Sequence, residues 1–227
     1  MEYGLKLSKG QEALISSTEK PVNKIYIETG WDPSNNYEDM DIDSSVLVYS
    51  YSNPNKQEVI CYHNMESKDK CIIHNGDNLT GEEGYVDEDD ERYEGDVDEI
   101  IDVNLKDLKS DYDRLVVFIN IFECESRNQT FEDVENLFIR VRKTDDNSTI
   151  CEYNVMEKMR DDTLLVIGLF YKKDNKWTFK AVGQSYKFNS IEEFAKMVKE
   201  HKKTRSEILV FCYITTLQQR LHQLGRH

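Results

Sequence analysis

Polar and hydrophobic positions alternate along most of the chain, and runs of β-branched and aromatic residues recur between turn signals such as SNPNK and TDDNS. This alternation predicts β-strands, because successive side chains of a strand point to opposite faces. The segment KKDNK, between LLVIGLFY and WTFKAVG, predicts a hairpin turn. We expect eleven strands, near residues 3–8, 22–28, 44–51, 57–63, 71–74, 98–103, 112–122, 136–143, 148–155, 163–173 and 177–186.

Helical periodicity is rare before residue 188. One short helix is expected at QTFEDVENL, residues 129–137. Many short strands with few helices predict an all-β fold, an antiparallel β-sandwich of two packed sheets.

The end of the chain has a different pattern. Ser190 followed by Glu193 forms a capping-box pattern, and Ile191, Phe194 and Val198 share one helical face. A second segment has a heptad-like spacing of apolar residues at Val210, Ile214, Leu217, Leu221 and Leu224. This segment predicts either a terminal helix packed on the sandwich or a helix that binds a partner or a second copy of the chain.

These patterns divide the chain into two parts. Residues 1–187 form the predicted β-sandwich domain, and residues 188–227 form a helical extension. Residues 85–94 are interpreted as an acidic insertion within the first part.

Charge is concentrated in one segment. The chain has 44 acidic and 29 basic residues, a net charge of −15, and residues 77–102 alone hold thirteen acids and one base. Such acidity argues against nucleic-acid binding, which needs a basic face. The segment is therefore either a solvated loop or a site for a cation.

The cysteines and the apolar runs indicate the compartment. The five cysteines are scattered and form no CxxC pair, which favours free, mostly buried thiols in a reducing compartment. The first ten residues lack an apolar run of signal-peptide length, and the longest apolar run, ILVFCYI, is far shorter than a membrane span. We therefore expect a cytoplasmic protein.

Two motifs could bind a cation. Asp41 and Asp43 lie two residues apart at the start of a strand, so both carboxylates are expected on one face. Like charges held together raise the energy of the folded state unless a cation neutralises them. In GDNLTG, two glycines bracket a tight loop that presents Asp77 and Asn78, which suits a hard cation coordinated by oxygen atoms.

The insertion itself is not an EF-hand, because Arg92 stands where the calcium loop starting at Asp87 would need glycine. A run of like charges without apolar residues cannot bury itself, so we interpret residues 85–94 as a loop without a specific ligand. The five histidines have no zinc spacing, and no phosphate-binding glycine loop is present. The sequence therefore predicts no enzymatic activity.

Several motifs, taken in order, resemble the TerD-type domain of tellurium-resistance and stress proteins. The family's L-x-K-G opening is similar to LKLSKGQ, its W-D pair and DLDAS strand to GWDPSNNYEDMDIDSS, and its GDNLTG loop stands here unchanged. Its EARGQxFxxVxNAFIRV segment resembles ESRNQTFEDVENLFIRV, and its YRRGGxWKFxAVGQGY segment resembles YKKDNKWTFKAVGQSY. The resemblance extends over about residues 5–186.

The resemblance implies a β-sandwich that binds calcium through loops at one end. The positions that match the family's ligands are Asp41, Asp43, Asn64, Asp77, Asn78, Asp96, Asp98 and Glu99. The chain also departs from the family pattern. Lys68 and Lys70 replace Pro and Gly in SPDGS, and Asn128 replaces the Gly of EARGQ.

These features predict a calcium-binding interaction module with an unidentified protein partner, acting in stress response or calcium-linked signalling. The alternative is calcium-dependent membrane docking, which this acidic chain could achieve only if calcium bridged it to anionic lipid. An enzyme acting on tellurium oxyanions has no support from a reactive cysteine or a cofactor motif.

Overall fold

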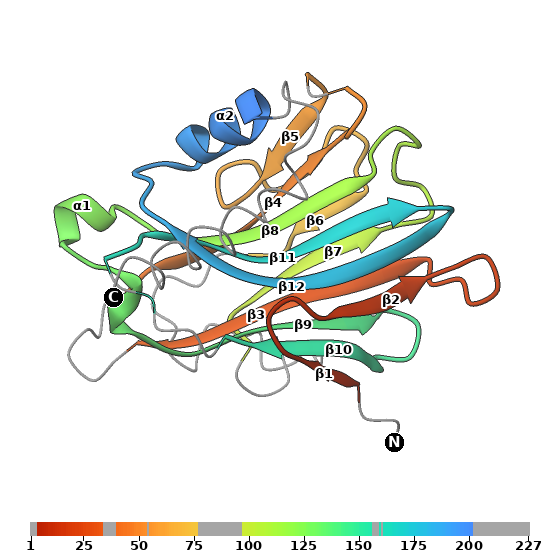
Figure 1. Cartoon of the computed structure of the whole chain (residues 1–227), viewed down its shortest axis with the longest axis horizontal. Helices are drawn as coiled ribbons and strands as arrows, with labels where there is room; N and C mark the ends of the chain where they lie inside the picture. The colour runs from red at the N-terminus through yellow and green to blue at the C-terminus, as the bar shows by residue number, and fades with distance from the viewer. Residues whose placement is uncertain are drawn as a thin grey trace, which may run out of the picture.

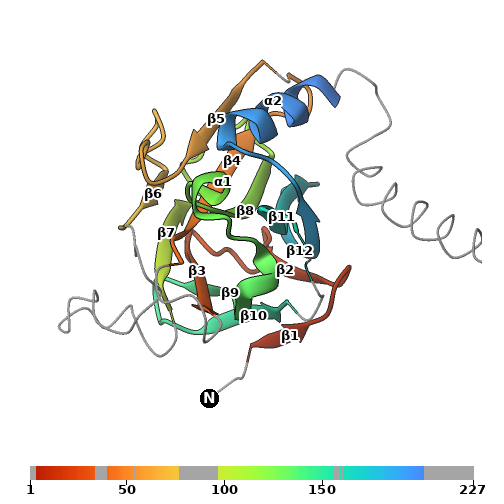
Figure 2. The same cartoon turned by 90° about the vertical axis from the view of Figure 1, so that its left-hand side faces the viewer.

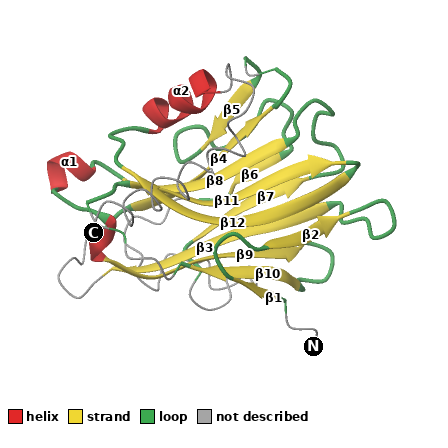
Figure 3. Cartoon of the chain, viewed as in Figure 1, coloured by secondary structure: helices red, strands yellow, loops and turns green. Residues whose placement is uncertain are grey.

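The computed structural model describes residues 4–33, 40–53, 55–76, 97–155, 159 and 161–201. These residues form two six-stranded sheets packed face to face (Figure 1). Strands dominate the described part of the chain, as the colouring in Figure 3 shows. The predicted β-sandwich is therefore confirmed.

The first sheet has the strand order β1-β10-β9-β3-β7-β6. Its neighbouring strands are antiparallel, except that β1 pairs with β10 in parallel. Its strands are β1 Leu5–Leu7, β10 Thr149–Asn154, β9 Val134–Lys143, β3 Lys24–Pro33, β7 Glu99–Asn104 and β6 Ile72–His74.

The second sheet has the strand order β2-β12-β11-β8-β4-β5, and all its neighbouring strands are antiparallel. Its strands are β2 Glu12–Ser16, β12 Lys176–Tyr186, β11 Leu164–Lys173, β8 Arg114–Ile121, β4 Ile42–Tyr49 and β5 Gln57–Ile60.

The main core lies between the two sheets. Ile27, Ile101 and Ile139 of the first sheet and Val46 and Val117 of the second belong to one buried cluster. Since side chains alternate along a strand, the residues of β4, β6 and β7 that face this space can be assigned from their buried neighbours. Ser44, His74 and Glu99 are buried polar residues at such inward positions.

Helix α2, Ile191–His201, covers the outer face of the second sheet (Figure 2). Its Ile191, Phe194 and Val198 are buried against that sheet, which confirms the predicted helical face. The Ser190 side chain accepts a hydrogen bond from the Glu193 N–H at 3.2 Å, as the capping pattern predicts. The division of the chain at residues 187 and 188 stays a prediction, and the heptad-like segment at 210–224 lies outside the described residues.

Two elements differ from the prediction: one strand was missed, and one expected helix is not formed. Strand β2 was not predicted, because EALIS is rich in residues with high helix propensity. The helix expected at residues 129–137 is a single 3-10 turn at Phe131–Asp133, preceded by a short helix α1 at Cys124–Arg127. Residues 134–137 instead begin β9, where Val134 and Glu135 pair with β3. Pairing along the sheet outweighs the local helical pattern.

The cysteines agree with the expected free thiols. Cys61, Cys71, Cys124 and Cys151 are free and buried, and Cys212 lies outside the described residues. Burial raises the pKa of Cys151 to about 12, so this thiol stays protonated near neutral pH. Within the described residues, no helix is long and apolar enough to cross a membrane.

Candidate metal centre

Four of the predicted calcium ligands lie near the end of the sandwich that carries α1, seen from the front in Figure 2. Asp41 and Asp43 stand at the start of β4, opposite the end of β8, where Ile42 pairs with Ile121. Asp98 and Glu99 stand at the start of β7. The two segments come from different sheets, and the fold brings them together.

Glu99 links the two sheets. Its side chain occupies the same face of β7 as the core residues Ile101 and Val103, and only 1% of its surface is exposed. Its Oε2 accepts a hydrogen bond of 2.6 Å from the Ser44 N–H in β4. Its Oε1 is also buried and has no hydrogen-bond partner among the described residues. A buried carboxylate oxygen without a donor is costly, so this atom is suited to a cation.

Asp43 is buried on the other face of β4. Its Oδ2 accepts a hydrogen bond of 3.0 Å from the Asn120 side chain in β8. The negative charge of this carboxylate affects the pKa of the Cys61 thiol. Burial first, and then the charges of Asp43 and Glu192, raise the pKa of Cys61.

Asp41 is buried one residue before β4 begins. Its Oδ2 lies 3.7 Å from the Arg127 Nη2 of α1, and its carbonyl oxygen accepts a hydrogen bond from the Phe122 N–H at 2.8 Å. The segment that follows β8 therefore holds Asp41 in place through both a side chain and the backbone.

Asp98 and Asn64 make different contacts. Asp98 is half-buried, and its Oδ2 accepts a hydrogen bond of 2.8 Å from the Trp31 N–H near the end of β3. Asn64 is exposed in the turn between β5 and β6, where its side-chain amide donates to the Val59 carbonyl at 2.5 Å. Its side-chain nitrogen thus stabilises its own turn, which leaves the side-chain oxygen as the atom that could contact a cation.

The remaining predicted ligands, Asp77, Asn78 and Asp96, lie outside the described residues. Within the part of the chain that is described, no three His, Cys, Asp or Glu side chains are grouped so that they could hold a metal ion. The described carboxylates nevertheless have the oxygen chemistry that Ca²⁺ prefers, and Glu99 Oε1 is a buried acceptor without a donor. Their donor chemistry therefore fits calcium, although the described residues do not form a complete coordination shell.

Sequence reasoning missed the residues that hold these carboxylates. His74, Ser44 and Asn120 contact predicted ligands, and no motif singled out Ser44 or Asn120. One signal was available for His74. It stands two residues after Ile72 in a short strand and directly before the GDN loop, so an inward-facing polar side chain beside that loop could have been expected.

A second group of buried charges lies on β3 and β9. The Glu28 carboxylate lies 2.7 Å from the Arg140 Nε and 2.5 Å from the Arg142 Nε. Burial raises the pKa of Glu28, and the two arginines oppose this effect. These arginines therefore compensate a charge within the first sheet.

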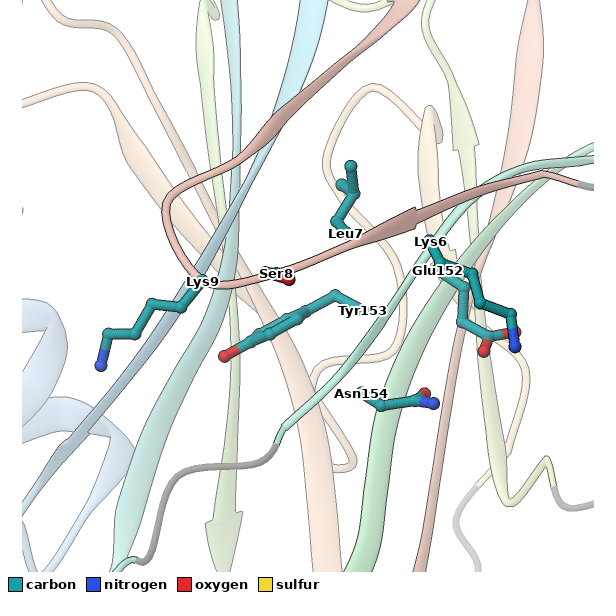
Figure 4. A pocket seen from close by; sticks show the side chains of 7 residues that line it. All are labelled: Lys6, Leu7, Ser8, Lys9, Glu152, Tyr153 and Asn154. Atoms are coloured by element: carbon teal, nitrogen blue, oxygen red, sulfur yellow. The ribbon is translucent and has the colours of Figure 1, made fainter.

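A pocket of about 410 Å³ lies beside β1 and β10 (Figure 4). Lys9 points to one side of this pocket, whereas Lys6, Glu152 and Asn154 point to the other, so the polar groups do not converge on one point. The Lys9 Nζ donates a hydrogen bond of 2.6 Å to the Gly183 carbonyl. This contact joins LKLSKGQ to AVGQSY, and it indicates that the lysine of the opening motif stabilises the fold.

Comparison with known proteins gives a consistent picture. A family model described as the TerD domain matches residues 3–198. The general stress protein 16U of Bacillus subtilis is 31% identical over 189 residues, which cover 80% of this chain and 91% of that protein. The tellurium resistance protein TerD of Serratia marcescens is 29% identical over 183 residues, covering 79% and 90% respectively.

Solved structures support the fold. The structure of a homologue of the telluride resistance protein TerD from Streptomyces coelicolor A3(2) has a TM-score of 0.60 and 19% identity, covering 78% of this chain and 98% of that one. A protein described as of unknown function, SAV2460, also has a TM-score of 0.60, with 24% identity and coverage of 77% and 95%.

Proposed function

Because the chain belongs to the TerD domain family, whose members include proteins named for general stress and for tellurium resistance, we propose that it is a calcium-binding interaction module. It would act without catalysis, in stress response or calcium-linked signalling.

The observation that carries this proposal is the buried carboxylate of Glu99. Its Oε2 accepts a hydrogen bond from Ser44, whereas its Oε1 is buried without a hydrogen-bond partner among the described residues. Asp41 and Asp43, buried at the start of β4, add two further carboxylates near the same end of the sandwich. A cation would lower the free energy of this arrangement, because carboxylates taken out of water need a compensating charge.

The calcium would be held by oxygen atoms from four segments of the chain. The residues that would hold it are Asp41, Asp43, Asn64, Asp77, Asn78, Asp96, Asp98 and Glu99. Six to eight oxygen ligands are usual for Ca²⁺, so a set of this size would serve one ion or share ligands between two. Bound calcium would supply positive charge that neutralises the carboxylates and fixes the loops.

Calcium should raise the melting temperature of the protein, because a ligand that binds only the native state stabilises it. At a calcium concentration about 100 times Kd we expect an increase of roughly 5–10 °C, reversed by a chelator. Differential scanning fluorimetry measures the melting temperature with calcium and after addition of the chelator. Calorimetric titration measures the Kd. A melting curve that calcium does not move would contradict the proposal.

Two matched variants locate the site. Asp43→Asn removes a charge from a buried predicted ligand and keeps its shape, so calcium affinity should fall about 10-fold or more. Asp89→Asn removes one charge from the acidic insertion and should leave the affinity nearly unchanged. Equal losses in the two variants would show that general acidity, rather than this site, attracts the ion.

A further inference from the structure

His74 lies buried between the two sheets, next to Glu99. It ends β6, it is on the same strand face as the core residue Ile72, and 2% of its surface is exposed. Its Nε2 lies 3.6 Å from the Glu99 Oε2, and neither side chain has any exposed surface. A buried imidazole beside a buried carboxylate needs defined hydrogen-bond partners, and both of its nitrogens have one.

The contacts of the ring define which nitrogen carries the proton. The Gly76 N–H donates a hydrogen bond of 3.4 Å to Nδ1, so Nδ1 is the acceptor. In a neutral imidazole the other nitrogen, Nε2, then carries the proton. This Nε2 lies 3.2 Å from the Ser44 carbonyl oxygen, to which it donates.

Ser44 completes the arrangement. Its carbonyl accepts from His74, while its N–H donates to the Glu99 Oε2 at 2.6 Å. One backbone position in β4 of the second sheet thus contacts both β6 and β7 of the first sheet. Because Oε2 is held by the Ser44 N–H, the orientation of the carboxylate is fixed and Oε1 is the oxygen left for another ligand.

We propose that His74 is a positioning residue that connects two segments of the calcium site, and this inference rests on the proposed function. Through Nε2 it helps to fix Ser44 and Glu99, and through Nδ1 it holds Gly76, the residue directly before Asp77. Residues that orient metal ligands in this way usually contribute strongly to metal affinity, although they do not touch the metal.

The backbone at Gly76 supports this role. Its φ is 152°, a conformation that residues with a side chain rarely adopt. The hydrogen bond from the Gly76 N–H to the His74 Nδ1 holds the backbone at this position.

Two substitutions separate the two contacts of the ring. In His74→Gln the side-chain amide can reach the position of Nε2 but leaves the Gly76 N–H without its acceptor. In His74→Asn the shorter amide reaches the position of Nδ1 and loses the contact with Ser44. The control is Ile72→Val, which removes a methyl group from the same face of the same strand and makes no polar contact.

Calcium affinity is measured by calorimetric titration, and amide hydrogen exchange of Gly76 is measured in the calcium-free protein. We expect both His74 variants to bind calcium about 10–100-fold more weakly than the wild type, and Ile72→Val to bind it normally. Exchange at Gly76 should accelerate in His74→Gln more than in Ile72→Val. In the wild type, ¹⁵N NMR should show His74 protonated on Nε2, a measurement that needs no variant to fold.

The outcomes are distinct. If the wild type binds calcium and the His74 variants bind it equally well, the residue is structural and the inference is wrong. A wild-type ring protonated on Nδ1, or unchanged exchange at Gly76, would also overturn it. If the wild type binds no calcium, the proposed function fails, and this inference fails with it.

Discussion

Lys70 adopts a left-handed backbone conformation, with a φ of 57°, in a turn where the family pattern has glycine. The turn is closed by hydrogen bonds, since the Lys70 N–H donates to the Ser67 carbonyl at 2.8 Å. Although burial raises the pKa of Asp69, hydrogen bonds from Ser67 and Cys71 outweigh it and hold this pKa below its usual value. Hydrogen bonds thus stabilise the turn, although lysine is unfavourable in the left-handed conformation of residue 70.

Lys70→Gly should therefore stabilise the protein by roughly 0.5–1 kcal/mol. Relief of the left-handed strain is worth roughly 1–2 kcal/mol, and the greater entropy of glycine in the unfolded chain removes roughly 0.4–1 kcal/mol of it. Urea unfolding gives the difference. Asn128→Gly is the comparison, because Asn128 also replaces a family glycine and has a φ of 52°, but asparagine tolerates this conformation better. A gain at Asn128 as large as that at Lys70 would contradict this explanation.

At the scale of elements, α2 completes the second hydrophobic cluster of the molecule. The Phe194 ring lies 4.7 Å from the Phe118 ring of β8, and Phe194 is fully buried. Without α2 the outer face of the second sheet would expose apolar side chains, which are Leu47, Tyr49, Val116, Phe118, Leu164, Val166 and Val182. A patch of this kind on a monomer promotes association.

Two truncations test how far the folded unit extends. A chain that ends after His201 keeps α2 and should unfold cooperatively without aggregating. A chain that ends after Lys187 loses α2 and should bind the dye ANS, aggregate and melt at lower temperature, because its apolar outer face is exposed. Size-exclusion chromatography and thermal melting measure these effects. If the shorter chain behaves like the longer one, α2 is dispensable and the predicted division at residues 187 and 188 is also a boundary in stability.

Sequence pattern predicted the elements well where alternation was strong and poorly where it competed with helix propensity. The run RLVVFINI alternates between the two clusters and was predicted correctly as β8. In QTFEDVENL the apolar residues Phe131, Val134 and Leu137 are spaced by three, which is a helical signal, yet pairing with β3 decides the structure. A local pattern cannot report a partner strand that is about 100 residues away in the chain.

At the scale of the whole molecule, the same limit applies to the candidate site. Sequence motifs singled out the carboxylates as candidate ligands, because clustered acids and the GDN loop are local features. The contacts of Ser44 with His74 and Glu99 arise only when the two sheets pack, so no local pattern could predict them. The sequence also distinguishes the ten residues of the insertion from the ligand segments. This distinction can be tested by changing the net charge of the whole molecule.

Deletion of residues 85–94 removes six acids and one base and changes the net charge from −15 to −10. If calcium acts only by screening the repulsion of an acidic chain, the deletion should weaken its effect, and an equal ionic strength of KCl or MgCl₂ should reproduce it. If calcium occupies a site built by the sandwich, calcium affinity should stay within about threefold after the deletion at 150 mM salt, where charges more than about 8 Å away are screened.

A specific site should also distinguish the two ions. Mg²⁺ should raise the melting temperature much less than Ca²⁺, because it demands octahedral geometry and gives up its water reluctantly. Calorimetric titration of both chains with both ions decides between these cases, and equal responses to Ca²⁺ and Mg²⁺ would favour screening.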